Sequence, residues 1–334
     1  MRKLIAPAIG AITTLALIAA PTEAANTVIA DLRVLTPDTT LEEGTSYVVG
    51  REKVPTDPNA ECSFGGAGGS GERYTLPQPT ALGLLKAASE ANHTLRPLSL
   101  TDEFGFGLAI CGIGGVDGSN GSFWSVRKNG KEANQGAQIL EVREGNEIVF
   151  YLTPDVFPDP NPGALTLHVQ PRAMPGTVEA RVTLTQCVSN PEPPFENVCS
   201  KDPAGGVEIT GGSTEVVTGS DGIAQVPVVA QGSYSLQAVD PPFIPSRALS
   251  VCVSSELDEC PPFRGKKIIG RVQSDKIDGT RGPDRIRGGG GADEIRITQG
   301  GEDVVACGAG SDTVIRREED ADDDLRDCEH VVRR

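Results

Sequence analysis

Five aspartates near the C-terminus recur at an almost constant spacing of nine residues. They are Asp275, Asp284, Asp293, Asp303 and Asp312, and one extra residue, Ile297, interrupts the period. An aliphatic residue follows each aspartate by two positions: Ile277, Ile286, Ile295, Val305 and Val314. A glycine precedes all but the first by two positions, at Gly282, Gly291, Gly301 and Gly310, and Gln273 replaces it in the first unit. This period predicts a coil of short strands and turns.

Each unit divides into a six-residue turn and a short strand whose aliphatic side chain points inward. Glycines allow the turn to adopt positive φ and to present its carbonyl oxygens. Two units complete one turn of a parallel roll, so units two apart stack on the same side. Stacking therefore places Asp275, Asp293 and Asp312 on one side of the roll, and Asp284 and Asp303 on the other.

The segment from Gly288 to Arg296 matches the nonapeptide G-G-x-G-x-D-x-U-x at every position. The tail thereby resembles the haemolysin-type calcium-binding repeats of secreted bacterial proteins. Calcium takes six to eight hard oxygens, which stacked turns of this kind supply. We therefore expect the chain to bind calcium ions through the five aspartates and the four turn glycines. The alternative is a disordered Gly/Asp-rich end, which has no need to keep an aliphatic residue in register.

The units differ in how well they suit a metal. Asp293 with Asp312 is the best candidate pair, because both turns keep at least two glycines. A metal site that uses Asp275 is less favoured, because Gln273 replaces the turn glycine there. The Asp303 turn is also less suited to a metal, because it lacks its leading glycines. Ile297 is expected to bulge. We expect the acidic segment 318–329 to be solvated rather than to bind metal, and we expect folding of the tail to be coupled to the metal because its carboxylates repel one another.

Eight cysteines fall in pairs along the chain: Cys62 and Cys111, Cys187 and Cys199, Cys252 and Cys260, Cys307 and Cys328. None lies in a C-x-x-C spacing, which disfavours a zinc or redox site. An even number of cysteines instead indicates structural disulfides in an oxidising compartment, although the sequence does not determine their connectivity. A bridge between Cys307 and Cys328 would cap the open end of the roll.

Residues 1–24 have the pattern of an export signal. Arg2 and Lys3 precede an apolar run over residues 4–20, and Thr22-Glu23-Ala24 offers a small-residue cleavage site. Pro7 and Gly10 interrupt the run, which disfavours a retained membrane anchor. We expect a secreted, extracellular protein, associated with the cell envelope or released, without a transmembrane segment in the mature chain. The net charge of −16 argues against a nucleic-acid partner.

Proline clusters divide the rest of the chain. The segment 154–162 reads as a linker, because its alternating prolines prevent both helix and strand interior. A second break follows at residues 261–265. The predicted modules are therefore 25–153, 163–260 and 265–334. Their many short β-branched runs predict a mostly β, multidomain fold.

In the first module, Thr80 is the expected N-cap of one helix that reaches Ala91. A hairpin is expected from 123–126 through the Asn129-Gly130 turn to 139–142. Together with the strand at 148–152, these segments resemble the transcobalamin-like C-terminal domain, which implies a β-grasp-like α+β fold. The resemblance also implies a bound small molecule, but not cobalamin, because the helical domain of those carriers is missing. Trp124 and Phe106 are the candidate ligand-binding residues, and the competing interpretation of Trp124 is a core aromatic.

The middle module alternates short strands and turns over residues 163–260. Its turn spacing resembles immunoglobulin-like or carboxypeptidase-regulatory-like sandwiches of exported bacterial proteins, which implies a spacer. The sequence shows no catalytic constellation, since its three histidines lie in different modules. We expect a secreted calcium-binding protein that acts as a ligand-binding or adhesion module for a small molecule, glycan or cell-surface partner. The alternatives are a structural envelope protein without a small ligand and an extracellular hydrolase that uses acidic loops.

Overall fold

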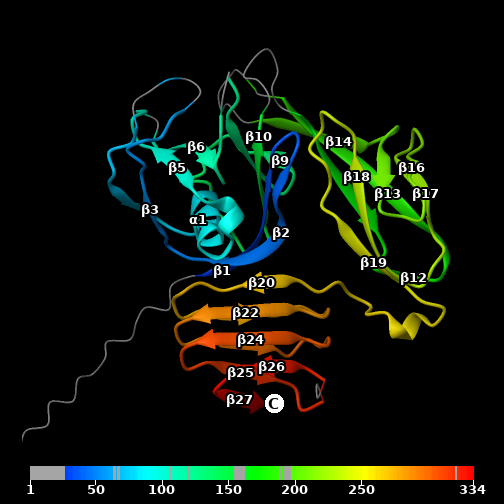
Figure 1. The fold of residues 1–334 in the computed structure, drawn as a ribbon. Coiled ribbons are helices and arrows are strands. Elements are labelled where there is room, and N and C mark those ends of the chain that lie inside the picture. Colours follow the sequence, from blue (N-terminus) through cyan, green and yellow to red (C-terminus); the bar gives the residue numbers. More distant parts are fainter. Residues whose placement is uncertain are drawn as a thin grey trace, which may run out of the picture.

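The computed structural model describes residues 27–62, 65, 68–105, 107–118, 121–153, 162–188, 190, 197–319 and 322–334. They form three bodies: an N-terminal α+β domain, a two-sheet sandwich beside it and a stack of short strands below it (Figure 1). The predicted mostly β, multidomain class is confirmed. The predicted export signal, Phe106 and most of the proline linker lie outside the described residues.

The N-terminal domain is a mixed sheet covered by one helix. Its elements are β1 (Val28–Leu35), β2 (Thr40–Val49), β3 (Lys53–Pro55), β4 (Arg73–Thr75), α1 (Ala81–Ala91), η1 (His93–Leu95), β5 (Leu98–Thr101), β6 (Ala109–Ile113), β7 (Val116–Asp117), β8 (Trp124–Lys128), β9 (Lys131–Glu132) and β10 (Glu147–Leu152). The sheet runs in the order β2-β1-β10-β8-β9, with β1 parallel to β10 and antiparallel to β2. This is the β-grasp arrangement that the sequence predicts. Smaller sheets join β3 to β4 and β5 to β6 and β7.

The helix begins where the sequence predicts. The Thr80 hydroxyl accepts a hydrogen bond from the Gly83 backbone N–H at 3.1 Å, as an N-cap does. Leu82, Leu84 and Leu85 are fully buried in the domain core, so the helix is held by its apolar face.

The predicted hairpin is partly wrong. Asn129 and Gly130 form the turn, with φ of 53° and 77°. The strand that returns is the short β9, however, and β8 pairs along its length with β10 instead. The segment 139–142 passes the start of the helix, where the Leu140 carbonyl accepts from the Ala81 N–H at 2.9 Å. Leu140 and Val142 pack into the core beside the helix instead of extending the sheet, and Ile139 is exposed.

The middle domain is a sandwich of two sheets, as predicted. Its elements are β11 (Ala164–Val169), β12 (Arg172–Ala173), β13 (Gly176–Val188), β14 (Val198–Pro203), β15 (Glu208–Thr210), β16 (Val216–Val217), β17 (Ile223–Val228), β18 (Gly232–Val239), β19 (Leu249–Val253) and η2 (Leu257–Glu259). One sheet contains β11, β13, β14 and β17, and the other has the order β12-β19-β18-β15-β16. Alternate residues such as Val178, Ala180 and Val182 fill the space between them.

The C-terminal domain is a β-solenoid-like roll of two parallel columns. Its strands are β20 (Lys267–Ile269), β21 (Lys276–Asp278), β22 (Arg285–Gly290), β23 (Glu294–Ile297), β24 (Val304–Ala309), β25 (Thr313–Arg316), β26 (Asp324–Arg326) and β27 (His330–Arg333). One column is β20-β22-β24-β26 and the other is β21-β23-β25-β27. The periodic aliphatic residues are at most 1% exposed and form the core between the columns. The predicted coil of two units per turn agrees with this arrangement.

One expectation about the roll is wrong. Ile297 does not bulge: it extends β23, pairs with Arg316 and is 1% exposed, because the turn that follows absorbs the extra residue. In the acidic segment, Glu318, Glu319, Asp322 and Asp324 are exposed, as expected of a solvated run, but the segment also contains β26 and leads into β27. The disulfide between Cys307 and Cys328 ties this last turn to the core, as predicted.

Each of the four disulfides joins two successive cysteines of the sequence. They are Cys62–Cys111, Cys187–Cys199, Cys252–Cys260 and Cys307–Cys328. The first anchors the long loop after β3 to β6, and the second crosses between β13 and β14. Such bridges fit an oxidising compartment. None of the helices in the described part of the chain is long and apolar enough to cross a membrane.

The roll continues the sheet of the N-terminal domain. β20 pairs in parallel with β2, through Ser46 with Ile268 and Tyr47 with Ile269, so one sheet of nine strands runs through both domains (Figure 1). Ile29 and Val48, on the first two strands, complete the aliphatic core of the roll. The first coil of the roll therefore builds on a strand that the N-terminal domain already holds in place. The sequence did not predict this junction.

Candidate metal centre

The aspartates of the β21 column form a ladder of hydrogen bonds along the roll. The backbone N–H of Asp275 donates to Oδ1 of Asp293 at 2.8 Å, and that of Asp293 donates to Oδ1 of Asp312 at the same distance. The N–H of Asp312 donates in turn to Oε2 of Glu329 at 2.8 Å. All three aspartates are at most 3% exposed. The three aspartates therefore stack on the same side of the roll, as the sequence predicts.

The second column repeats this pattern. The N–H of Lys266 donates to Oδ1 of Asp284 at 2.7 Å, the N–H of Asp284 to Oδ1 of Asp303 at 2.8 Å, and the N–H of Asp303 to Oδ1 of Asp323 at 3.1 Å. One carboxylate oxygen of each repeat thus caps the preceding turn. This structural role accounts for an aspartate in every unit without any metal.

Sequence reasoning missed the last member of each column, Asp323 and Glu329. Both follow the rule of the other units, because an aliphatic residue stands two positions later, at Leu325 and Val331. Their spacings of 20 and 17 residues from the preceding acid of the same column depart from the regular step. The surrounding run of acidic residues conceals that signal.

The first unit of each column also satisfies its second carboxylate oxygen internally. Oδ2 of Asp275 accepts from the Arg271 backbone N–H at 2.6 Å, while the Arg271 guanidinium donates to Oδ1 at 2.7 and 2.9 Å. Oδ2 of Asp284 accepts from the backbone N–H of Thr280, whose hydroxyl donates to Oδ1 at 2.8 Å. Asp275 and Asp284, two of the predicted metal ligands, thus have protein partners at both carboxylate oxygens.

Asp293 and Asp312 differ at this second oxygen. In the described residues, Oδ2 of each is buried and has no hydrogen-bond partner. Four positions earlier, where the first units have Arg271 and Thr280, these units have Gly289 and Gly308, both with φ of 105°. A residue with a Cβ rarely adopts this angle, and the backbone N–H that caps Oδ2 in the first units makes no such bond here. The glycines therefore leave two carboxylate oxygens open on the side of the roll that the sequence favoured.

The turn glycines have two different roles. Gly291, Gly301 and Gly310 adopt positive φ, as the sequence predicts. Gly282 is not in this region; it is required because a Cβ would lie 2.3 Å from the Arg264 carbonyl carbon. A Cβ on Gly288 would likewise lie 2.6 Å from Oδ2 of Asp293, so its absence makes room for that oxygen.

The negative charge of the aspartates in the β21 column is only partly balanced by nearby positive charge. Burial raises the pKa of Asp293 to about 6, and the carboxylates of Asp275 and Asp312 add to this effect, while the Asp275 N–H and Arg271 oppose it. A cation beside Asp293 would favour the ionised form. Within the described ranges, however, no three acidic, histidine or cysteine side chains converge as a metal cluster. A cation at Asp293 and Asp312 would therefore need carbonyl oxygens of the glycine turns as further ligands, which calcium accepts readily.

Trp124 lies in the core of the N-terminal domain and beside a hollow. It is 8% exposed, and its indole N–H donates to the Val116 carbonyl at 3.3 Å. It lines a hollow of about 290 Å³ together with mainly apolar residues, among them Leu108, Ile110, Val126 and Phe150. Trp124 is thus a core aromatic that also lines this hollow. Phe106, its predicted partner, lies outside the described residues.

Comparison with known proteins bears on this domain. Residues 79–154 match the family model described as a domain of unknown function, DUF4430. This family is associated with transcobalamin-like domains, in agreement with the resemblance that the sequence suggests. The matched segment holds the helix, Trp124 and the closing strand β10. No curated protein and no solved structure matches the chain.

Proposed function

We propose that this chain is an extracellular calcium-binding protein whose N-terminal domain contacts a ligand or a cell surface. The observation that carries the calcium proposal is the pair of buried, unpartnered Oδ2 atoms of Asp293 and Asp312. Burying a carboxylate oxygen without a partner costs several kcal/mol in proteins, by order of magnitude, and a hard cation removes this cost. Asp303, on the other column, is a secondary candidate, and Asp275 and Asp284 act as internal caps.

Calcium titration of residues 25–334 tests this proposal. We expect heat of binding by isothermal calorimetry and a rise in melting temperature below about 1 mM calcium, as for extracellular modules. The double variant Asp293→Asn, Asp312→Asn should lose both signals, because the amide still accepts the ladder hydrogen bond but lacks the charge. Asp278→Asn is the matched control, since Asp278 is exposed on the same roll. Equal binding by all three proteins, or none by the parent, would refute the proposal.

The hollow at Trp124 supports the ligand-binding part of the proposal. Its volume is close to the lower end of the range for small-molecule sites, and its lining is mainly apolar. Trp124 is the single tryptophan of the chain, so its fluorescence reports directly on the hollow. We expect the apolar dye anilinonaphthalene sulfonate to quench this fluorescence, and Ala133→Leu, which fills the hollow, to abolish the effect. Ala173→Leu, outside this hollow, is the control. Quenching that survives Ala133→Leu would favour a structural protein without a small ligand.

A further inference from the structure

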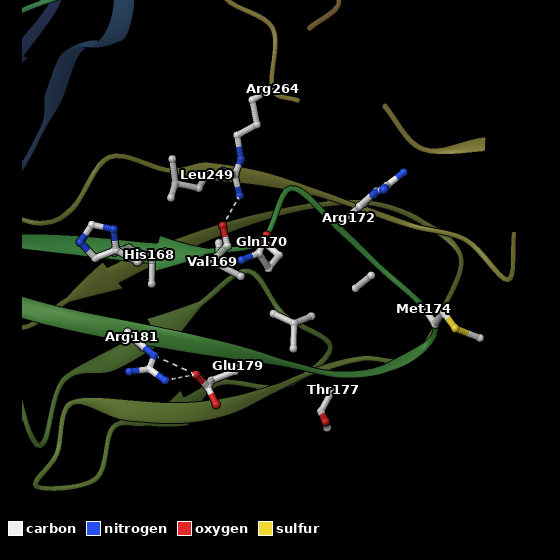
Figure 2. A pocket seen from close by; sticks show the side chains of 13 residues that line it. His168, Val169, Gln170, Arg172, Met174, Thr177, Glu179, Arg181, Leu249 and Arg264 are labelled. Atoms are coloured by element: carbon white, nitrogen blue, oxygen red, sulfur yellow. Dashed lines mark hydrogen bonds and ion pairs between the residues drawn. The ribbon is translucent and has the colours of Figure 1, made fainter. Parts of the chain in front are cut away.

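Two further hollows adjoin the sandwich. One, of about 600 Å³, is formed by β11, β13 and the segment around Arg172 (Figure 2). The other, of about 620 Å³, lies between β19, the connection to the roll and the turns before β22 and β24. The two hollows share the lining residues Leu249 and Arg264, and this adjoining pair is called the groove below. The groove does not include Trp124 or the open aspartates.

The groove is basic although the chain is strongly acidic overall. Its basic side chains are Arg172, Arg181, Arg247, Arg264, Lys266 and Arg285, and its acidic ones are Glu179, Asp284 and Glu302. The chain as a whole has a net charge of −16. A local surplus of positive charge in a concave surface concentrates anions there.

Three of these cations have no acidic partner. Arg172, Arg264 and Arg285 make no ion pair with any acid of the described residues, unlike Arg181, which pairs with Glu179 at 2.8 Å. Arg264 stands at the centre and is fixed by its bonds to the carbonyls of Ser250 and Val169, at 2.7 and 2.8 Å. Figure 2 shows its side chain reaching down to Val169, with Arg172 to one side. A rigid guanidinium with a remaining N–H edge suits a carboxylate, sulfate or phosphate group.

The rest of the lining suits hydroxyl groups. Gln170, Thr177 and Ser233 also line the two hollows and offer neutral donors and acceptors. Phe263, 46% exposed, adds an apolar ring at the margin, and the Arg281 guanidinium lies 5.6 Å from its centre. The acids Glu179 and Glu302 disfavour a densely charged polymer. We propose that this groove binds an acidic polysaccharide, a saccharide chain whose carboxylate or sulfate groups alternate with hydroxyls.

Binding of defined polymers to residues 25–334 tests the assignment. We expect polygalacturonate or kappa-carrageenan to bind, with dextran as the neutral comparison, and the affinity to fall as salt rises from 50 to 300 mM (about 14 to 6 Å of screening length). The first polymer carries only carboxylate groups and the second only sulfate groups, so the two distinguish carboxylate from sulfate as the anionic group. The variant Arg172→Gln, Arg285→Gln should bind at least about tenfold more weakly, since it removes from each hollow a cation that forms no ion pair with an acid of the described residues. The charge-preserving Arg172→Lys, Arg285→Lys should keep most of the affinity.

The control is Arg143→Gln, Arg296→Gln, which changes the net charge equally at exposed sites outside the groove. Unchanged binding by the groove variant would overturn the proposal, as would an equal loss in the control. Dextran binding as tightly as the acidic polymers would overturn it too. Tighter binding to duplex DNA, poly-glutamate or phosphatidylserine vesicles would assign the groove to a different class of partner and would also contradict it.

Discussion

Asp31 and Arg247 form an ion pair of 2.6 Å between the first strand of the N-terminal domain and the sandwich. Lys266, the residue before the roll, approaches the other oxygen of the same carboxylate to 3.0 Å. One buried aspartate thus joins all three domains. Burial acts to raise the pKa of Asp31, but Arg247, the Ser46 hydroxyl and Lys266 together hold it below its usual value. Arg247 and Lys266 also line the hollow between the sandwich and the roll.

We predict that Asp31→Asn loosens the three-domain junction. The variant leaves Arg247 and Lys266 without their carboxylate, and breaking a buried pair costs about 3–5 kcal/mol. Because the pKa of Asp31 is lowered on folding, its contribution is present above the unfolded value of 3.8 and is lost as pH falls through the folded one. Urea unfolding at pH 7 should show the loss, and the difference between the variant and the parent should shrink below pH 4. Asp278→Asn should change neither.

In calcium-free buffer, the stability that Asp293 contributes should change with pH in the opposite direction to the stability that Asp31 contributes. Its pKa rises from 3.8 to about 6 on folding, so the folded chain binds a proton more tightly than the unfolded chain does. The stability contributed by this group therefore falls as pH rises from about 4 to 6. Asp293→Asn should have a melting temperature similar to that of the parent near pH 4 and higher by roughly 5 °C at pH 7 in EDTA. A constant difference across this range would show that the site carries no excess negative charge.

The roll should not fold by itself. An isolated fragment 265–334 lacks β2 as well as Ile29 and Val48, which complete its core. We predict that circular dichroism of this fragment shows little strand even with calcium, whereas the same segment is ordered in residues 25–334. A fragment that folds fully on addition of calcium would show that the N-terminal domain is dispensable as a template.

Removing the terminal disulfide should release the last coil. Cys307 and Cys328 close a loop of 21 residues, and such a bridge contributes about 3 kcal/mol. In Cys307→Ser, Cys328→Ser, we expect faster amide exchange in β26 and β27 and unchanged exchange in β21 and β22. Loss of protection throughout the roll would mean that the coil unfolds as a single unit.

The period of the aspartates and aliphatics was sufficient to predict the roll, its two columns and the five periodic aliphatic residues of its core. The same pattern did not reveal that Asp275 and Asp284 are capped internally, because this depends on contacts with Arg271 and Thr280. The sequence does carry the underlying signal, since these two residues stand where Gly289 and Gly308 stand in the open units. Local pattern thus favoured the pair Asp293 and Asp312, and the hydrogen bonds add a physical reason to prefer it.

The contacts between the domains could not be predicted from local sequence pattern. The pairing of Ser46 with Ile268 links segments that are far apart in the chain, and β20 by itself has only three residues. Pairing between distant strands has no periodic signature in one sequence. The same reason explains why the sequence did not predict the contact between Asp31 and Arg247.

The parallel pairing of β2 with β20 gives the coil a fixed origin and a direction of growth. Each later strand pairs with the preceding strand of its own column, in steps of 17 to 20 residues, and β26 and β27 stand at the ends of their sheets in the described residues. The disulfide between Cys307 and Cys328 ties this end to the core. Whole pairs of units can therefore be inserted or deleted between β20 and this disulfide while the pairing of β2 with β20 is kept. In related chains, variation in length should accumulate there in multiples of one full coil.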